Sequence, residues 1–153
     1  MIYKIIIALA GLFGIFRLFR ISDNFARTIV GGQIIAIGLT FIPVNTAVTI
    51  GFVLFIVTAM LAIVYGLFKK GFGINKKVFI LLISIPVFVA HIFALNHWPY
   101  TGIIGWTMLI PIFTYLILTL TNIKRYKNEL GFLTILAVDA AIKLSMTIEW
   151  INN

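Results

Sequence analysis

Three ionisable side chains lie inside long apolar runs of this sequence, where a charge needs a partner. Asp139 and Lys143 are at positions i and i+4 of the last run, with the acid first, which is the favourable order for an ion pair on one helical face. His91 lies at a matching depth in an earlier run. Two hypotheses follow. The three residues form a path for protons or ions, or a neutralised Asp139–Lys143 pair fixes the last helix, with His91 hydrogen-bonded beside it.

The apolar runs around these residues are typical of membrane-spanning helices. The chain has 153 residues, 62% of them hydrophobic, and a mean hydropathy of +1.16, whereas about half of an ordinary globular protein is apolar. The runs approach the roughly 20 residues that a spanning helix needs, and they lack the alternation of a barrel strand. We expect an all-α polytopic transmembrane bundle, one domain over 1–153. Its expected helices are about 2–19, 28–42, 46–68, 78–97, 102–121 and 130–151, with five spans as the alternative to six.

The basic residues predict the orientation of this bundle. Ten of the twelve fall in three gaps between apolar runs, at Arg17, Arg20, Arg27, Lys69, Lys70, Lys76, Lys77, Lys124, Arg125 and Lys127. The gaps around Pro43 and Pro99 contain none, so the positive-inside rule places the three basic gaps in the cytoplasm and both termini outside. Contact with anionic headgroups, about 1 kcal/mol per basic residue, accounts for the net charge of +8. Nucleic acid is therefore not expected as a partner.

No cofactor, metal site or catalytic set is expected. His91 and His97 are separated by about 600° of helical rotation, so they point to opposite faces and cannot both bind one haem. The chain has no cysteine and no HExxH motif, and Asp23, Glu129 and Glu149 fall near helix ends. No nucleophile motif surrounds any serine. The sequence therefore does not favour an enzyme.

Two further features of the predicted helices could shape a site. Pro86 and Pro111 lie mid-helix, where each frees the carbonyl group of the residue four positions before it. At the outer face, His97, Trp98 and Pro99 form an aromatic turn of the kind found at the headgroup level. Glu149, near the outer end of the last helix, reaches the same level, so a contact with His97 is one candidate.

The segment His97-Trp98-Pro99, followed by Thr101-Gly102-Ile103-Ile104-Gly105, resembles the His-Trp-Pro-Gly hairpin of the gliding-motility and type IX secretion motor membrane protein. That family forms a proton-driven stator with a partner subunit and uses a membrane-embedded glutamate. The resemblance implies a bacterial inner-membrane origin and assembly with partners. Tyr100 stands where the family has glycine, and the corresponding helices contain no mid-membrane glutamate. Six spans are predicted, where the family has two, and no functional residue can be carried over.

Three functions are consistent with the sequence. The leading hypothesis is a non-enzymatic subunit or scaffold of a larger assembly in the bacterial inner membrane, where it would contact the lipid bilayer and bind membrane proteins or copies of itself. The reason is that the short connections leave no room for an extramembrane domain. The second is a small transporter or proton- or ion-conducting protein that uses His91, Asp139 and Lys143. The third is a lipid-binding or lipid-modifying protein with its site at the turn of His97 and Trp98.

Overall fold

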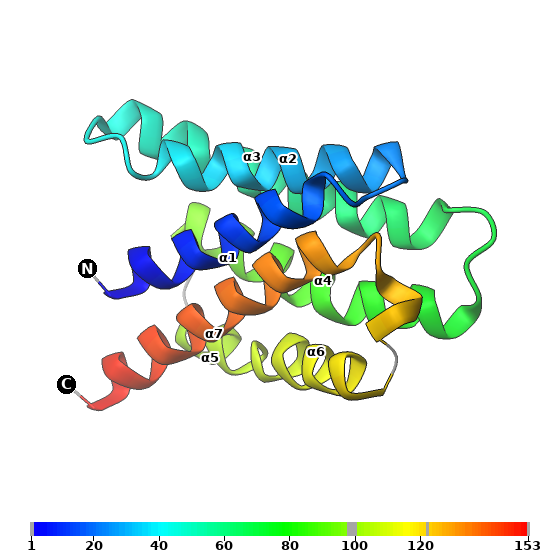
Figure 1. The fold of residues 1–153 in the computed structure, drawn as a ribbon. Coiled ribbons are helices and arrows are strands. Elements are labelled where there is room, and N and C mark those ends of the chain that lie inside the picture. The colour runs from blue at the N-terminus through cyan, green and yellow to red at the C-terminus, as the bar shows by residue number, and fades with distance from the viewer. Residues whose placement is uncertain (1, 98–100, 122, 153) are drawn as a thin grey trace.

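The chain folds as a bundle of helices. The computed structural model describes residues 2–97, 101–121 and 123–152, and within these ranges it contains no strand. The elements, drawn in Figure 1, are α1 (Ile2–Leu18), α2 (Asn24–Leu39), α3 (Asn45–Phe68), α4 (Ile74–Leu95), α5 (Thr101–Trp106), α6 (Leu109–Thr121), the short 3₁₀ helix η1 (Ile123–Tyr126) and α7 (Leu130–Asn152). The prediction of an all-α chain is confirmed.

Four segments are long and apolar enough to cross a membrane: α3, α4, Ile103–Thr121 and α7. This finding indicates an integral membrane protein. The helices α1 and α2 have 17 and 16 residues, or roughly 24–26 Å of length, which is less than a hydrocarbon core of about 30 Å. Full spanning by these two helices stays a prediction.

Several helix boundaries differ from the expected ones by up to four residues: α2 is Asn24–Leu39 where 28–42 was expected, and α4 is Ile74–Leu95 where 78–97 was expected. Asp23 starts α2 about one turn early, because its side chain accepts hydrogen bonds from the backbone N–H groups of Phe25 and Ala26. The expected helix 102–121 is interrupted between α5 and α6. Pro111 has no N–H to offer the carbonyl group of Thr107, which instead accepts from the amide of Ile110 at 3.0 Å.

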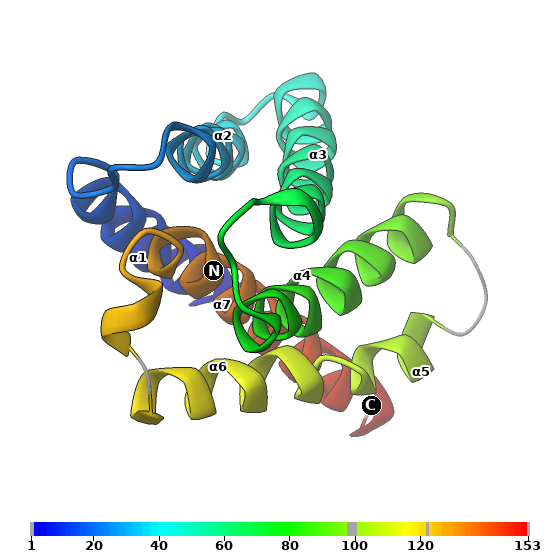
Figure 2. The same cartoon turned by 90° about the vertical axis from the view of Figure 1, so that its right-hand side faces the viewer.

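The helix α7 lies at the centre of the bundle. It packs against α1, α2, α4, α5 and α6, and the end view in Figure 2 shows the other helices arranged around it. Its first half is the core of the fold, with Phe132, Leu133, Ile135 and Leu136 fully buried. Outside these contacts, α3 packs against α2 on one side and against α4 on the other. Side chains of α7 therefore meet residues from almost every other helix.

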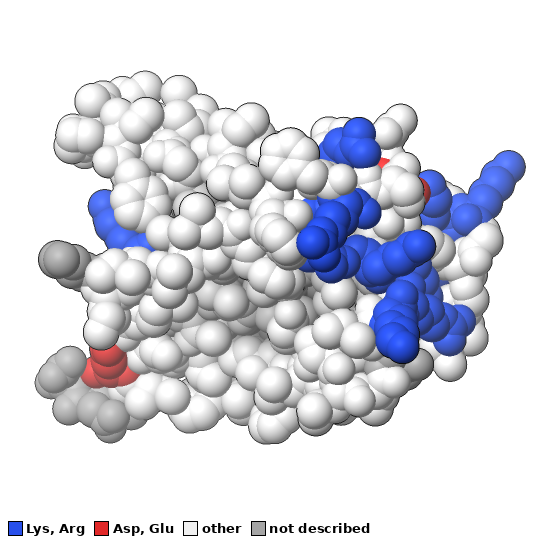
Figure 3. Space-filling view, in the orientation of Figure 1, with Lys and Arg blue, Asp and Glu red and all other residues white. Residues whose placement is uncertain are grey.

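The charges separate along the bundle axis. The connections α1–α2, α3–α4 and α6–α7 meet at one end, which we call the basic end, and Figure 3 shows most lysines and arginines gathered there. The start of α1, which contains Lys4, and the end of α7 lie at the opposite end, which we call the terminal end. The three basic gaps are thus neighbours in space. Their location in the cytoplasm stays a prediction.

We expect Gly51→Ala to destabilise the bundle by about 1–3 kcal/mol. A Cβ atom at Gly51 would lie 2.7 Å from the backbone oxygen of Ala36 and 3.0 Å from Cβ of Leu39, so α2 and α3 would have to separate. Thermal unfolding in detergent, followed by circular dichroism, measures the effect. The matched control is Gly31→Ala, because a Cβ there meets nothing within 4 Å. Equal melting temperatures for both variants would contradict the close α2–α3 packing.

Candidate functional site

His91 and Asp139 come together in the bundle interior, between α4 and α7. The Nε2 atom of His91 lies 3.6 Å from Oδ1 of Asp139, and His91 is only 3% exposed. Two aromatic rings of α3 flank the imidazole, with ring centroids 5.3 Å away for Phe52 and 5.0 Å away for Phe55. The structure therefore encloses this polar contact in an apolar and aromatic surrounding.

The hydrogen bonding of His91 determines where its protons lie. Its Nδ1 atom is 2.8 Å from the carbonyl oxygen of Val87. A carbonyl oxygen can only accept, so Nδ1 carries a hydrogen. In the neutral ring Nε2 then has a lone pair, which faces a carboxylate oxygen that cannot donate. The contact is favourable only when a proton lies on Nε2 or on Asp139. A proton on either group would therefore stabilise the contact between α4 and α7.

Lys143 takes a different position from the predicted one. Among the residues that the structure describes, Asp139 forms its ion pair with His91 and has none with Lys143 within 4.0 Å. Lys143 is half-buried one turn nearer the terminal end, where its charge still acts on His91. An i,i+4 spacing allows a pair, but the side chain of Asp139 is directed across the helix interface to α4.

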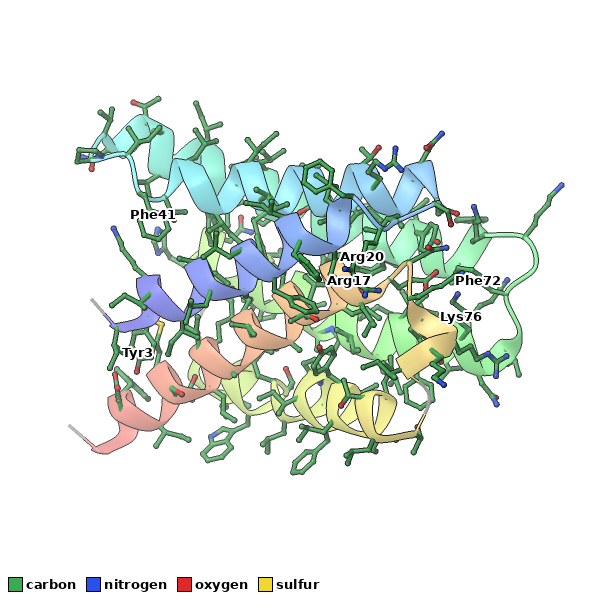
Figure 4. All side chains as sticks on the ribbon, in the orientation of Figure 1. Tyr3, Arg17, Arg20, Phe41, Phe72 and Lys76 are labelled. Atoms are coloured by element: carbon green, nitrogen blue, oxygen red, sulfur yellow. The ribbon has the colours of Figure 1, made fainter. Side chains whose placement is uncertain are left out.

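A pocket of about 220 Å³ lies beside the pair. His91 and Asp139 line its deep part, and Tyr3, Lys4 and Thr40 line it toward the terminal end. Figure 4 shows Tyr3 at that end of α1, and the ammonium group of Lys4 donates to the backbone oxygen of Thr40 at 3.3 Å. The Oδ2 atom of Asp139 is buried without a hydrogen-bond partner in the described structure. Water or a small solute thus has a route toward the pair from the terminal end.

A second buried acid, Glu129, lies at the basic end. It is 1% exposed, and its Oε1 atom accepts from the hydroxyl group of Tyr65 at 3.0 Å and from the ammonium group of Lys76 at 2.9 Å. The same ammonium group lies 4.2 Å from the ring centroid of Phe72, and both side chains are labelled in Figure 4. This contact ties α3 and α4 to the start of α7.

Asp23 extends the polar contacts at the basic end. Its carboxylate pairs with Lys69 and also acts on the hydroxyl group of Tyr65. Burial alone would raise the pKa of Asp23, but the hydrogen bonds from Lys69 and from the amides of Ala26 and Phe25 lower that pKa below its usual value. Asp23 is therefore ionised at neutral pH and holds α2 against the end of α3.

The importance of Glu129 and Tyr65 was missed in the sequence. The sequence places Glu129 near a helix end, and no motif singles out Tyr65 within the expected helix 46–68. One signal was available: Asp23 and Glu129 are the acids that lie within the basic gaps. An acid among so many lysines and arginines has a cation within reach, and an ion pair with that cation offsets the cost of removing the carboxylate from water.

The outer turn is described only in part. Trp98 and Pro99 lie outside the described residues, so the predicted aromatic turn stays a prediction. His97 is exposed, with the left-handed φ of 50° that is uncommon for a residue other than glycine. Glu149 accepts a hydrogen bond from Tyr3, which joins the ends of α1 and α7. The contact between His97 and Glu149 stays a prediction. In the described ranges, no group of three His, Cys, Asp or Glu side chains could hold a metal ion.

We expect Tyr65→Phe to lower the free energy of unfolding by about 1–3 kcal/mol, because Oε1 of buried Glu129 loses a donor. The matched control is Tyr126→Phe. Tyr126 is equally buried at the basic end, but its hydroxyl group makes no hydrogen bond within the described structure. Denaturant or thermal unfolding in detergent compares the two. A control that is as destabilised as Tyr65→Phe would show that the Glu129 hydrogen bond contributes little.

The lowered pKa of Asp23 predicts a pH dependence of stability. A depressed pKa adds stability above the ordinary value of 3.8, and this stability is lost as the pH falls through the folded-state pKa. We expect the melting temperature of the wild type to approach that of Asp23→Asn as the pH is lowered from 7 to 3. Asparagine keeps the helix cap but not the charge. A constant difference across this range would contradict the Asp23–Lys69 pair.

Similarity to known proteins adds no functional assignment to these two sites. Searches of protein-family models, curated proteins and solved structures find no match for this chain. The role of the protein therefore has to follow from the buried groups, the pocket and the charge distribution described above.

Proposed function

We propose that this chain is a small proton-translocating membrane protein. The observation that supports it is the contact of His91 with Asp139. Since Nδ1 is bound to the carbonyl oxygen of Val87, Nε2 faces Oδ1 of Asp139 at 3.6 Å, and a proton on either group makes this contact attractive. A buried pair that holds a proton beside a pocket is the first requirement of a proton carrier or channel.

The proposed orientation follows the charge distribution. With the basic end in the cytoplasm of a bacterial inner membrane, the terminal end and its pocket face outward. Exposed apolar side chains such as Phe113 on α6 and Val57 on α3 then face lipid. In this orientation the pair takes protons from the outer side, past Tyr3 and Lys4.

Protonation and deprotonation change the contact between two helices. With a proton present, the pair is either imidazolium and carboxylate or imidazole and carboxylic acid, and both forms attract. Loss of the proton leaves the lone pair of His91 Nε2 facing the Asp139 carboxylate, and the contact becomes repulsive. The nearby charge of Lys143 then offsets that of Asp139. Proton release thus loosens α4 from α7, which is a physical link between proton binding and a change of access.

Assembly into a larger complex is a second candidate. The resemblance at His97-Trp98-Pro99 to a proton-driven motor protein supports a proton-binding subunit that works with partners. The two candidates share the same site and differ in whether the isolated chain moves protons. Lipid binding or modification at the outer turn stays a prediction from the sequence.

We expect purified protein in liposomes to move protons down an imposed gradient, and Asp139→Asn to reduce that flux at least tenfold, because asparagine cannot hold the shared proton. An internal pH-sensitive dye reports the flux, with valinomycin and potassium to compensate charge. The matched control is Ser145→Ala, which removes from the same helix an exposed hydroxyl group that donates to the backbone oxygen of Ala141 and should keep the wild-type rate. Wild-type flux no greater than that of empty liposomes, or unchanged flux in Asp139→Asn, would refute proton translocation by the isolated chain.

A further inference from the structure

The bundle interior contains polar atoms that have no hydrogen-bond partner among the described residues. They are Nε2 and Oε1 of Gln33, Oγ of Ser84, Oε2 of Glu129 and Oδ2 of Asp139, along with Nε of Arg17. Gln33 and Ser84 have no exposed surface, and Glu129 is 1% exposed. A buried polar atom without a partner is destabilising, and ordered water is the usual partner where protein groups are lacking.

We infer that Glu129 is a second proton-binding site, joined to the His91–Asp139 pair by ordered water that Ser84 and Gln33 hold. This inference rests on the proposed proton translocation and specifies the part of the proton path between Asp139 and the basic end. The residues that line the pocket beside Asp139 reach toward the terminal end and include none from the basic end, so a proton that crosses the bilayer needs a further route from Asp139 to the basic end. Two residues with unsatisfied atoms, Ser84 and Gln33, lie at heights between Asp139 and the basic end.

The packing of α3 on α4 fixes the height of Ser84. Near the basic end, Gly66 packs on Ile80, and a Cβ atom there would lie 2.9 Å from Cγ2 of Ile80. Farther along, Phe55 lies beside His91. Ser84 is about one turn beyond Ile80, and His91 is about two turns beyond Ser84. Ser84 therefore lies between the basic end and His91.

The packing of α2 on α7 fixes the height of Gln33. A Cβ atom at Gly131, close to Glu129, would lie 2.9 Å from Cγ2 of Val30. Gln33 is about one turn beyond Val30, and Asp139 is about two turns beyond Gly131. Gln33 therefore lies between the two acids. Steps of one to two turns, ~5–11 Å along the axis, are bridged by a few waters whose oxygens lie about 2.8 Å apart.

Glu129 has one oxygen fixed and one free. Oε1 is bonded to Tyr65 and Lys76, whereas Oε2 can accept a proton from the water chain. The proton then leaves to solvent at the basic end, where Lys76 is 14% exposed. The net step moves one proton from Asp139 through water to Oε2 of Glu129 and then to bulk water, and no other bond is made or broken. Several other charged and titratable groups surround Glu129. They are Tyr65 of α3, Lys76 of α4, the Asp23–Lys69 pair, Tyr126 and Arg125 of η1, and Arg17 of α1. The Arg17 side chain donates to the backbone oxygen of Lys127.

The test compares proton flux in liposomes across four variants. We expect Glu129→Gln to lower flux at least tenfold, because glutamine keeps an oxygen acceptor for Tyr65 but cannot bind a proton at neutral pH. Gln33→Leu should lower flux several-fold by removing the water contacts. The matched control is Thr58→Val. Thr58 lies beside Gly32, level with Gln33, and is equally buried, but its hydroxyl group already donates to the carbonyl oxygen of Phe55. Wild-type flux is expected for this control.

A fourth variant separates a proton role from a structural one. Glu129→Gln leaves the charge of Lys76 unpaired and can unfold the chain, so Glu129→Gln with Lys76→Met removes both charges together. If this folded double variant keeps wild-type flux while Asp139→Asn loses it, the role of Glu129 is refuted and proton translocation stands. Equal loss in Thr58→Val and Gln33→Leu would also refute the water route. Absence of flux in the wild type would refute the proposed function itself, and the inference with it.

Discussion

Removal of an acid from water is the constraint on which this bundle depends. A carboxylate that leaves water in an apolar protein is stable only with a cation, with hydrogen-bond donors or with a proton. Asp23 has Lys69 and two backbone amides, Glu129 has Lys76 and Tyr65, and Asp139 has His91. Each carboxylate finds its partner on another segment of the chain. These contacts therefore fix how the helices pack as well as how the charges are neutralised.

Depth in the bundle separates the three acids into two kinds. Asp23 and Glu129 lie at the basic end, where long lysine side chains bring a permanent charge to the carboxylate and keep contact with solvent. Asp139 lies deeper, and its partner is a histidine, which is neutral or charged according to a single proton. The same physical requirement thus produces lysine-paired carboxylates at the basic end and a histidine-paired carboxylate in the interior. The pocket beside Asp139 gives that deeper site its access to water.

Most of the helical pattern could be predicted from the sequence, and the contacts between helices could not. Long apolar runs defined the helices, and the matching depths of His91 and Asp139 suggested that these residues meet. The same reasoning paired Asp139 with Lys143, because residue spacing identifies neighbours on one helix but not the direction in which a side chain turns. The pairing of Glu129 could not be predicted from residue spacing, because its partners Tyr65 and Lys76 are far away in sequence. The early start of α2 depends on one side chain, the Asp23 cap, and the break before α6 depends on the missing N–H group of Pro111.

Solid-state NMR of ¹⁵N-labelled histidine in liposomes tests the shared proton most directly. Histidine occurs at two positions, so His97→Asn leaves the ring of His91 as the one histidine signal. We predict that Nδ1 is protonated throughout, because it donates to Val87, and that Nε2 changes its hydrogen bonding with pH in a way that Asp139→Asn abolishes. A hydrogen on Nε2 with a bare Nδ1, or a titration that is the same in Asp139→Asn, would contradict the proton-sharing pair and the function built on it.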